Sequence, residues 1–407
     1  MLLPKPITSA RRAVVLALMC ICSVVAPTLL LAATIKNPQP IWTIDLKKYG
    51  FRGSRRGLVN DPGSLAYMAF SGGTVAVLFD QKAEEIPQKG TDSKKWLGWC
   101  LVGVFVDART GQLLATRTWI AYLPWPDTFF RTAAGNFLFL MRRFPKPVHI
   151  PTSPSEIQLI DGPLPTALLL LSPTGEELKR LELPIRGTPR NEHWEARLSP
   201  SGKSFLLTHT QTNSCQFVLL DADTLKLRFS WQQPDATRCA VVSTSDEQVL
   251  IHTREGRSLI GKFGDSLDDI TLPSSNSQFL ANNLIVTFGA APWGTAWITS
   301  STGKQISTFH FEVYDPGLRG VRPGVAPPFS SSDGRRFGTV TDQIVGPFLF
   351  RREEHTLYVW QEPEDKLIFT TQLGHSFIQW AEAALSNDGS RVAVLNGRKV
   401  SMYNLAR

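Results

Sequence analysis

One short segment of the sequence brings together side chains that can do acid–base chemistry or hold a cation. It is Glu192-His193-Trp194-Glu195, in which two carboxylates and an imidazole surround a tryptophan. Carboxylates and imidazoles serve as metal ligands and as general acids or bases. A solvated loop that enters a strand and packs its tryptophan would have the same composition. We favour that second interpretation.

A group of arginines forms the other candidate. Arg52, Arg55 and Arg56 are close in sequence, and Arg319 and Arg322 form a second pair. Together they would make a basic rim suited to an acidic ligand. The alternative, which we prefer, is a mildly basic surface in contact with solvent.

Motifs of the common catalytic sites are missing from the sequence. It contains no G-x-S-x-G, H-E-x-x-H, phosphate-binding loop, G-x-G-x-x-G or regularly spaced acidic calcium loop. Its seven histidines are scattered singly, and His209 and His252 fall in predicted strands, where we expect them to be satisfied structural residues. The motifs therefore predict no catalytic residue, no metal site and no cofactor.

The N-terminus carries an export pattern. Lys5, Arg11 and Arg12 precede a run at 13–33 in which only Ser23, Pro27 and Thr28 are not apolar. A basic segment followed by such a run is typical of a secretory signal, so we expect residues 1–33 to be removed and the protein to be periplasmic or secreted. The alternative is an uncleaved anchor, because the run is long enough to span a bilayer.

Charge and cysteine content set limits on the exported part. Removal of three basic residues lowers the formal charge from +8 to +5, which predicts no nucleic-acid binding. Cys100, Cys215 and Cys239 remain, so at most one internal disulfide can form. Cys215 with Cys239 is the closest pair in sequence, and buried free thiols are the alternative.

These candidates must be positioned by strands. One pattern recurs seven times after residue 34: an apolar run, a tight polar turn and a second apolar run. Glycine, asparagine and aspartate supply the positive φ that such turns need. The copies are AYMAFSGGTVAVLF from Ala66, FRTAAGNFLFLM from Phe130, ARLSPSGKSFLL from Ala196, CAVVSTSDEQVLI from Cys239, SQFLANNLIVTF from Ser277, PPFSSSDGRRFGTV from Pro327 and AALSNDGSRVAVL from Ala383.

A second hairpin pattern follows most copies, as in VFVDARTGQLLATRTW from Val104. Two hairpins make a four-stranded antiparallel unit, and the units repeat at about 53 residues, which is typical of a β-propeller with loop insertions. We predict an all-β, seven-bladed β-propeller over 34–407, with six or eight blades as alternatives. The last unit supplies only three strands, so we expect the segment at 40–46 to close the ring as its fourth strand.

The turns LSPSG at Leu198 and LSNDG at Leu385 resemble the L-S-P-D-G turn of WD-repeat-like and YVTN-type β-propellers. The likeness covers most of the chain after the N-terminal segment, although Trp-Asp dipeptides and the Gly-His entry of strict WD repeats are absent. It implies the propeller architecture. It implies little about function, because such folds host many functions.

Long insertions indicate where function would reside. They fall between the second and third strands of a blade or between blades, and both classes open on one face of a propeller. Binding energy concentrates in Trp, Tyr and Arg, so we expect anchors among these loops. Trp125, held between two prolines, is the first candidate. Trp194 and Arg322 are the second candidates. Glu192 and His193, which precede Trp194 in the sequence, are included with them.

Three function classes remain open. The first, which we favour, is an exported non-enzymatic propeller that binds a protein, peptide or glycan. The second is an enzyme, either a lactonase-like hydrolase or a quinoprotein-like dehydrogenase. The quinoprotein resemblance depends on DARTGQLLA from Asp107, but Ala115 stands where such families place a docking tryptophan. The third is a structural or assembly component.

Overall fold

The computed structural model describes residues 38–51, 66–86, 96–119, 129–143, 164–183, 193–210, 214–233, 237–243, 245–289, 294–310, 324–325, 328–345, 352–362, 366–376 and 381–405. Contacts divide the chain after Pro38, and the second unit, Gln39–Arg407, is a β-propeller. The predicted signal segment at 1–33 lies outside the described residues. Within them, no helix is long and apolar enough to cross a membrane.

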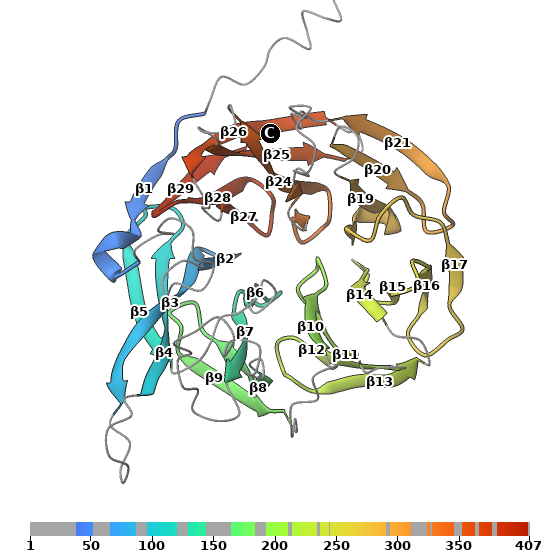
Figure 1. Ribbon diagram of the computed structural model, residues 1–407, viewed down its shortest axis with the longest axis horizontal. Coiled ribbons are helices and arrows are strands. Elements are labelled where there is room, and N and C mark those ends of the chain that lie inside the picture. The colour runs from blue at the N-terminus through green and yellow to red at the C-terminus, as the bar shows by residue number, and fades with distance from the viewer. Residues whose placement is uncertain are drawn as a thin grey trace, which may run out of the picture. The chain divides into compact units, whose positions relative to one another are not determined.

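Seven antiparallel sheets stand side by side as the blades of a ring (Figure 1). In blades 1 to 6 the chain runs from the innermost strand to the outermost. Blades 1 to 3 are β2 (Ala66–Ser71), β3 (Thr74–Ile86), β4 (Trp96–Asp107) and β5 (Leu113–Trp119); β6 (Phe129–Arg131), β7 (Phe137–Arg143), β8 (Leu164–Leu171) and β9 (Glu177–Glu182); and β10 (His193–Leu198), β11 (Ser204–Thr210), β12 (Cys215–Asp221) and β13 (Leu227–Gln233). Blades 4 and 5 are β14 (Thr237–Val242), β15 (Gln248–Thr253), β16 (Ser258–Lys262) and β17 (Asp268–Ile270); and β18 (Ser277–Phe279), β19 (Ile285–Gly289), β20 (Thr295–Thr299) and β21 (Gln305–His310).

The sixth blade has its innermost strand in two pieces. Both β22 (Gly324–Val325) and β23 (Phe329–Ser330) pair with β24 (Arg336–Val345), which is followed by β25 (Arg352–Gln361) and β26 (Lys366–Ser376). Two short 3-10 helices, η1 (Leu46–Tyr49) and η2 (Ala281–Asn283), are the helices of the described residues. The predicted all-β class and the seven blades are confirmed, and six or eight blades are excluded.

The seventh blade joins the two ends of the propeller. It consists of β27 (Ala381–Leu385), β28 (Arg391–Asn396), β29 (Lys399–Asn404) and, outermost, β1 (Trp42–Asp45). The register pairs Trp42 with Met402 and Asp45 with Lys399. The predicted ring closure by the segment at 40–46 is therefore confirmed. Pairing β1 with β29 leaves neither segment as an isolated edge.

The core consists of seven apolar layers, one between each pair of neighbouring blades. Because successive side chains of a strand point to opposite faces, one strand contributes to two layers. In β8, Leu169 and Leu171 pack toward blade 1, whereas Leu168 and Leu170 pack toward blade 3. Burial of both faces explains why the central strands are continuously apolar rather than alternating.

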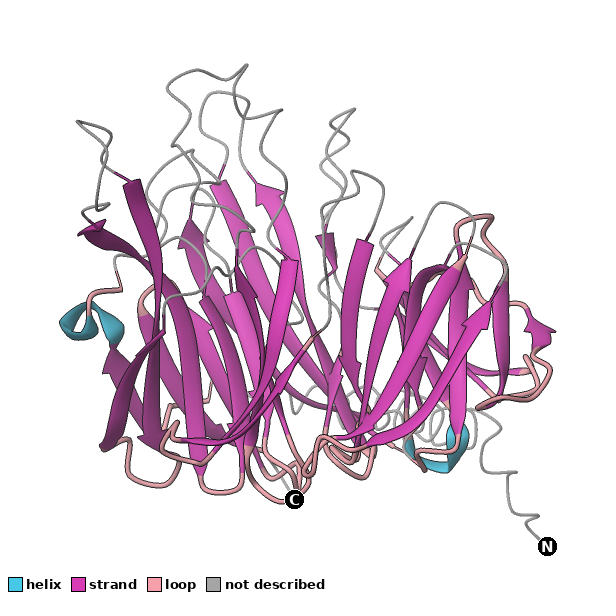
Figure 2. Cartoon of the chain, turned by 90° about the horizontal axis from the view of Figure 1, so that it is seen from below, coloured by secondary structure: helices cyan, strands magenta, loops and turns pink. Residues whose placement is uncertain are grey.

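The two faces of the ring differ in the length of their connections (Figure 2). On one, which we call the short-turn face, the first strand of each blade turns into the second and the third into the fourth, through segments such as 199–203, 331–335 and 386–390. On the opposite face, which we call the long-loop face, lie the strand ends that flank the segments at 52–65, 87–95, 120–128, 144–163, 184–192 and 311–323; these segments themselves are outside the described residues.

Candidate functional site

Four turns of the short-turn face share one local structure. A serine begins the turn, and its Oγ accepts the backbone N–H of the residue five positions later. The donors are Ser204, Gln248, Arg336 and Arg391 at 3.0 to 3.1 Å from Ser199, Ser243, Ser331 and Ser386. The serine backbone N–H in turn donates to the carbonyl of the same later residue. The L-S-x-x-G pattern is therefore a hydrogen-bonded hairpin turn, which explains its recurrence in the sequence.

Glycine occupies the position of positive φ in three of these four turns, and at position 389 it is needed for backbone and steric reasons. Gly389 has φ of +67°, where side chains other than glycine are strained. A Cβ at this position would also lie 2.8 Å from Cδ of Arg336, whose Nη1 donates to the Gly389 carbonyl at 2.7 Å. Arg336 lies on blade 6 and Gly389 on blade 7, so the close approach fixes the spacing of two blades.

Hydrogen bonds also join neighbouring turns around the ring. The Ala133 N–H donates to the Gly202 carbonyl at 2.9 Å, linking blades 2 and 3, and the Ser332 N–H donates to the Asn387 carbonyl at 3.0 Å, linking blades 6 and 7. Ser201 Oγ donates to Asp246 Oδ2 at 2.7 Å, linking blades 3 and 4. Turns of the short-turn face are therefore held together by hydrogen bonds at these three junctions between blades.

Arg131 stands at the middle of this layer. It is the last residue of β6, and its guanidinium reaches blades on the far side of the ring axis. Nη1 donates to Asn387 Oδ1 at 2.8 Å, and Nη2 donates to the backbone carbonyls of Ser330 at 2.8 Å and Pro200 at 3.4 Å. One side chain from blade 2 thus binds blades 3, 6 and 7.

Two further polar groups complete this arrangement, which we call the axial cluster: Arg131, Asn387, Ser330 and Gln278. Gln278 lies on β18 and its Nε2 donates to Ser330 Oγ at 2.6 Å. Ser330 is 8% exposed. Burial lowers the pKa of Arg131 to about 10, while the charge of Asp333 acts in the opposite direction. The guanidinium is therefore still positive at neutral pH.

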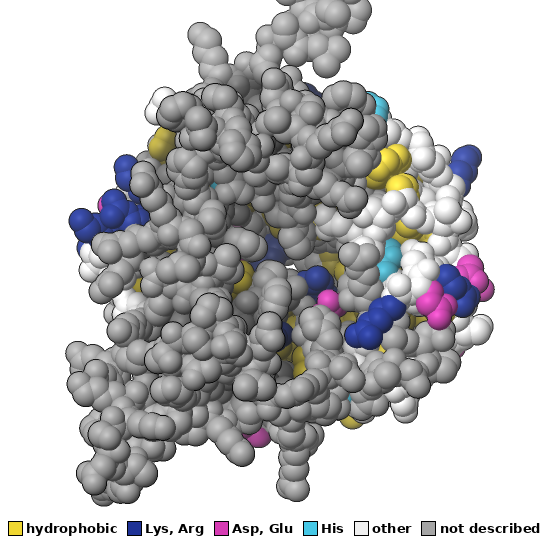
Figure 3. All heavy atoms as spheres, viewed as in Figure 1, with side chains coloured by type: hydrophobic (Ala, Val, Ile, Leu, Met, Phe, Trp, Pro, Cys, Tyr) yellow, Lys and Arg dark blue, Asp and Glu magenta, His cyan; other side chains and the backbone are white. Residues whose placement is uncertain are grey.

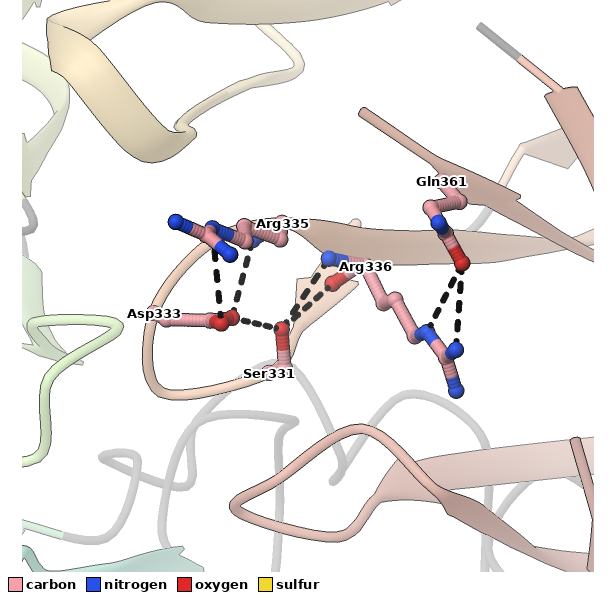
Figure 4. A network of polar contacts seen from close by, with 5 residues as sticks. All are labelled: Ser331, Asp333, Arg335, Arg336 and Gln361. Carbon is pink, nitrogen blue, oxygen red and sulfur yellow. Dashed lines mark hydrogen bonds and ion pairs between the residues drawn. The ribbon is translucent and has the colours of Figure 1, made fainter. Parts of the chain in front are cut away.

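A polar network of blade 6 borders the axial cluster (Figure 4). Asp333 Oδ1 accepts hydrogen bonds from Ser331 Oγ at 2.6 Å and from the Arg335 N–H at 3.0 Å, and its Oδ2 lies 3.9 Å from Arg335 Nε. Arg336 donates from Nε and Nη2 to Gln361 Oε1. Asp333 is therefore held by its own turn and by Arg335 rather than by direct contact with Arg131.

Trp194 is the one predicted binding residue whose side chain the structure describes. It is half-buried on β10, and its ring stacks on that of His209, with centroids 3.9 Å apart and planes at 5°. The Trp194 carbonyl also accepts from Arg142 Nη2 at 3.3 Å. This stack lies at the long-loop end of the strands, because Trp194 pairs with His209 near the start of β10 and the end of β11.

The other predicted site residues are outside the described part of the chain. This holds for Trp125, Glu192 and Arg322, and for the side chain of His193, whose backbone begins β10. Their roles stay predictions. The arginines of the predicted basic rim, at 52, 55, 56, 319 and 322, also lie outside it. Sequence reasoning did not single out Arg131, because no local pattern marks an arginine whose partners are far away in the chain.

The remaining titratable candidates have structural partners. His252 is buried on β15 with Nδ1 2.9 Å from Ser258 Oγ, as expected of a satisfied structural histidine. Cys215 is a fully buried thiol with Sγ 3.5 Å from Thr210 Oγ1 and forms no disulfide, so the predicted pairing with Cys239 is wrong and the alternative of a buried thiol holds for Cys215. Among the side chains that the structure describes, no three His, Cys, Asp or Glu residues gather as a metal site would require.

Comparison with known proteins shows no family. No protein-family model matches the chain, and no curated protein matches it. Among solved structures, a chain of the mitotic checkpoint complex matches 91% of this chain and 96% of its own length, at 11% identity and a TM-score of 0.48. BamB from Moraxella catarrhalis matches 90% and 97%, at 12% identity and 0.40. Hydrazine synthase from Kuenenia stuttgartiensis matches 68% and 77%, at 9% identity and 0.43. The description of the fold above therefore depends on the strands of this chain and not on these matches.

Proposed function

We propose that this protein is an exported, non-enzymatic β-propeller that binds a protein, peptide or glycan through its long-loop face. The observation that supports this most is the difference between the two faces. The turns of the short-turn face are short and hydrogen-bonded to one another, whereas the long connections all leave the strands on the opposite side. A rigid scaffold with long loops on one face is a common arrangement of binding surfaces.

The export part of the proposal depends on the sequence at 1–33. The basic segment and the apolar run predict cleavage of a signal after export. Expression of the full chain in a bacterial host, followed by intact-mass measurement of periplasmic protein, tests this. We expect a chain that begins near residue 34. A soluble cytoplasmic product that retains Met1 would contradict it.

The binding part is tested at Trp125. The full chain is immobilised and used to capture partners from cell-envelope extract, and the captured molecule is then purified and its affinity measured. We expect Trp125→Ala to abolish binding with little change in melting temperature, because an interface anchor contributes to the complex and not to the fold. Leu227→Ala is the matched control, since Leu227 is 64% exposed at the rim of the short-turn face.

The opposite outcome is equally clear. If Trp125 only packs within a blade, alanine there lowers the melting temperature and leaves binding untouched. The same result at Arg322 and Trp194 would remove the reason for placing the site on the long-loop face. For Trp194 the stack on His209 predicts some loss of stability in either case.

A further inference from the structure

Among the described residues, Arg131 has no direct partner of opposite charge. The three hydrogen bonds that it makes with them end on uncharged oxygens, namely one side-chain amide and two backbone carbonyls. Within the described part of the chain no carboxylate forms an ion pair with it. Asp333 acts on it only over a longer distance and is already bound by Ser331 and Arg335. A partly buried cation without a counter-ion is unfavourable, because desolvation is not repaid by an ion pair.

The neighbours of Arg131 also have more hydrogen-bond donors than acceptors. Asn387 turns Oδ1 toward Arg131, so its Nδ2 amide hydrogens point elsewhere. Ser330 Oγ accepts from Gln278, which leaves its own hydroxyl hydrogen to donate. A guanidinium has five N–H groups, and three are used here. No acceptor for the other donors of these side chains occurs among the described residues.

We propose that the axial cluster is a binding site for an oxyanion, either a carboxylate or a phosphate group. Such a ligand supplies the negative charge and the acceptor oxygens that Arg131, Asn387, Ser330 and Gln278 do not find among the described residues. Guanidinium groups bind carboxylate and phosphate through paired N–H donors. A bound water would accept these hydrogen bonds but would leave the charge uncompensated. The space-filling view shows basic side chains, with an acidic one beside them, between the grey residues near the ring axis (Figure 3).

This site goes beyond the proposed function and does not depend on it. The axial cluster is made by innermost strands and turns of blades 2, 5, 6 and 7, not by the long loops. It can therefore bind a free anion whether or not the long-loop face binds a macromolecule. The two proposals are tested by different variants and different ligands.

The test places a carboxylate inside the cluster. In Asn387→Asp the new side chain lies within hydrogen-bond distance of Arg131 Nη1 and supplies the missing charge internally. Gln278→Glu places a carboxylate in the cluster from blade 5, next to Ser330. It is the variant to use if Asn387→Asp does not fold. Asn404→Asp is the matched control, because Asn404 is exposed on the outer part of the seventh blade and receives the same change of charge.

The full chain is titrated with sodium phosphate and, separately, with sodium acetate, against sodium chloride at equal ionic strength. Melting temperature and isothermal titration calorimetry are the readouts. For the wild type and Asn404→Asp we expect a saturable rise in melting temperature with phosphate, acetate or both. Comparison of the phosphate titration with the acetate titration shows which kind of oxyanion binds. In Asn387→Asp or Gln278→Glu we expect the affinity to fall at least ten-fold.

Two results would overturn the proposal. One is a wild type that responds to neither anion beyond the chloride reference. The other is an equal response in the wild type and in the folded cluster variants, because phosphate also stabilises proteins without binding a specific site. A retained anion response with a failed partner capture would leave the axial site standing and would count against the long-loop proposal alone.

Discussion

Trp42 and Gly111 form a contact between blades 7 and 1, where the ring closes. The effect of this contact on the free energy of unfolding can be measured with a double-mutant cycle. Trp42 lies on β1 in blade 7, and Gly111 lies in the turn between β4 and β5 in blade 1. Trp42 Nε1 donates to the Ala108 carbonyl at 3.0 Å. A Cβ on Gly111 would lie 2.9 Å from Cγ and Cδ2 of Trp42, which is closer than packed carbon atoms approach. The methyl group of Gly111→Ala should therefore clash with Trp42 and displace β1.

Gly256→Ala is a control that separates two contributions to the loss of unfolding free energy, the steric clash and the backbone strain. Gly111 and Gly256 both have positive φ, +73° and +87°, but a Cβ on Gly256 meets nothing within 4 Å. Backbone strain alone should cost about 1–2 kcal/mol at either position. Overpacking against the indole should add about 1–3 kcal/mol to Gly111→Ala. Gly111→Ala is thus expected to be the more destabilising of the two.

Removal of the indole should cancel most of that added cost. Trp42→Ala by itself should cost about 2–4 kcal/mol, because it loses ring packing and one hydrogen bond. In the double variant only the Trp42 Cβ, at 3.3 Å, still meets the new methyl group. We expect the double variant to be more stable than the sum of the single variants predicts, by about 1–2 kcal/mol.

Urea unfolding of the wild type and of the four variants, followed by circular dichroism, gives these free energies. Additivity of the two substitutions within about 0.5 kcal/mol would refute the contact, because independent sites behave in that way. Equal costs for Gly111→Ala and Gly256→Ala would refute it as well. Either result would mean that β1 does not pack against blade 1 in the way that the structure shows.

Three further outcomes are expected. Phe337 is fully buried between blades 5 and 6 against Phe288 and Trp360, so Phe337→Ala should cost about 3–5 kcal/mol in urea unfolding; a cost below about 1 kcal/mol would contradict this packing. Hydrogen bonds from Thr110 hold the pKa of Asp107 below its usual value, so its contribution to stability is present above the unfolded-state pKa of about 4 and is lost as the pH falls through the lower folded-state value. Asp107→Ala should therefore differ less from the wild type in unfolding free energy at pH 2.5 than at pH 7. Burial raises the pKa of the Cys100 thiol, so peptide-level mass spectrometry should show slower iodoacetamide alkylation at pH 8 in the native protein than in urea, and equal rates would argue against that environment.

Most of the architecture could be predicted from the sequence, because the residues that determine each hairpin are close together in the chain. A hairpin turn needs a residue with positive φ and an apolar run on each side, and both features lie within about a dozen residues. Seven such patterns therefore predicted seven blades. Ring closure followed from a count of strands, since a final unit with three strands and a spare strand at 40–46 leaves one consistent pairing.

The side-chain partners were decided by the tertiary structure alone. Trp194 was predicted as a binding anchor from its residue type, but whether it stacks on His209 depends on the register of β10 with β11, which composition does not specify. Arg131 is the stronger case. Its partners on blades 6 and 7 are 199 and 256 residues away in the chain. They reach it only because closure of the ring brings the innermost strands to a common axis, and no periodic pattern in the sequence records which side chain will extend across that axis.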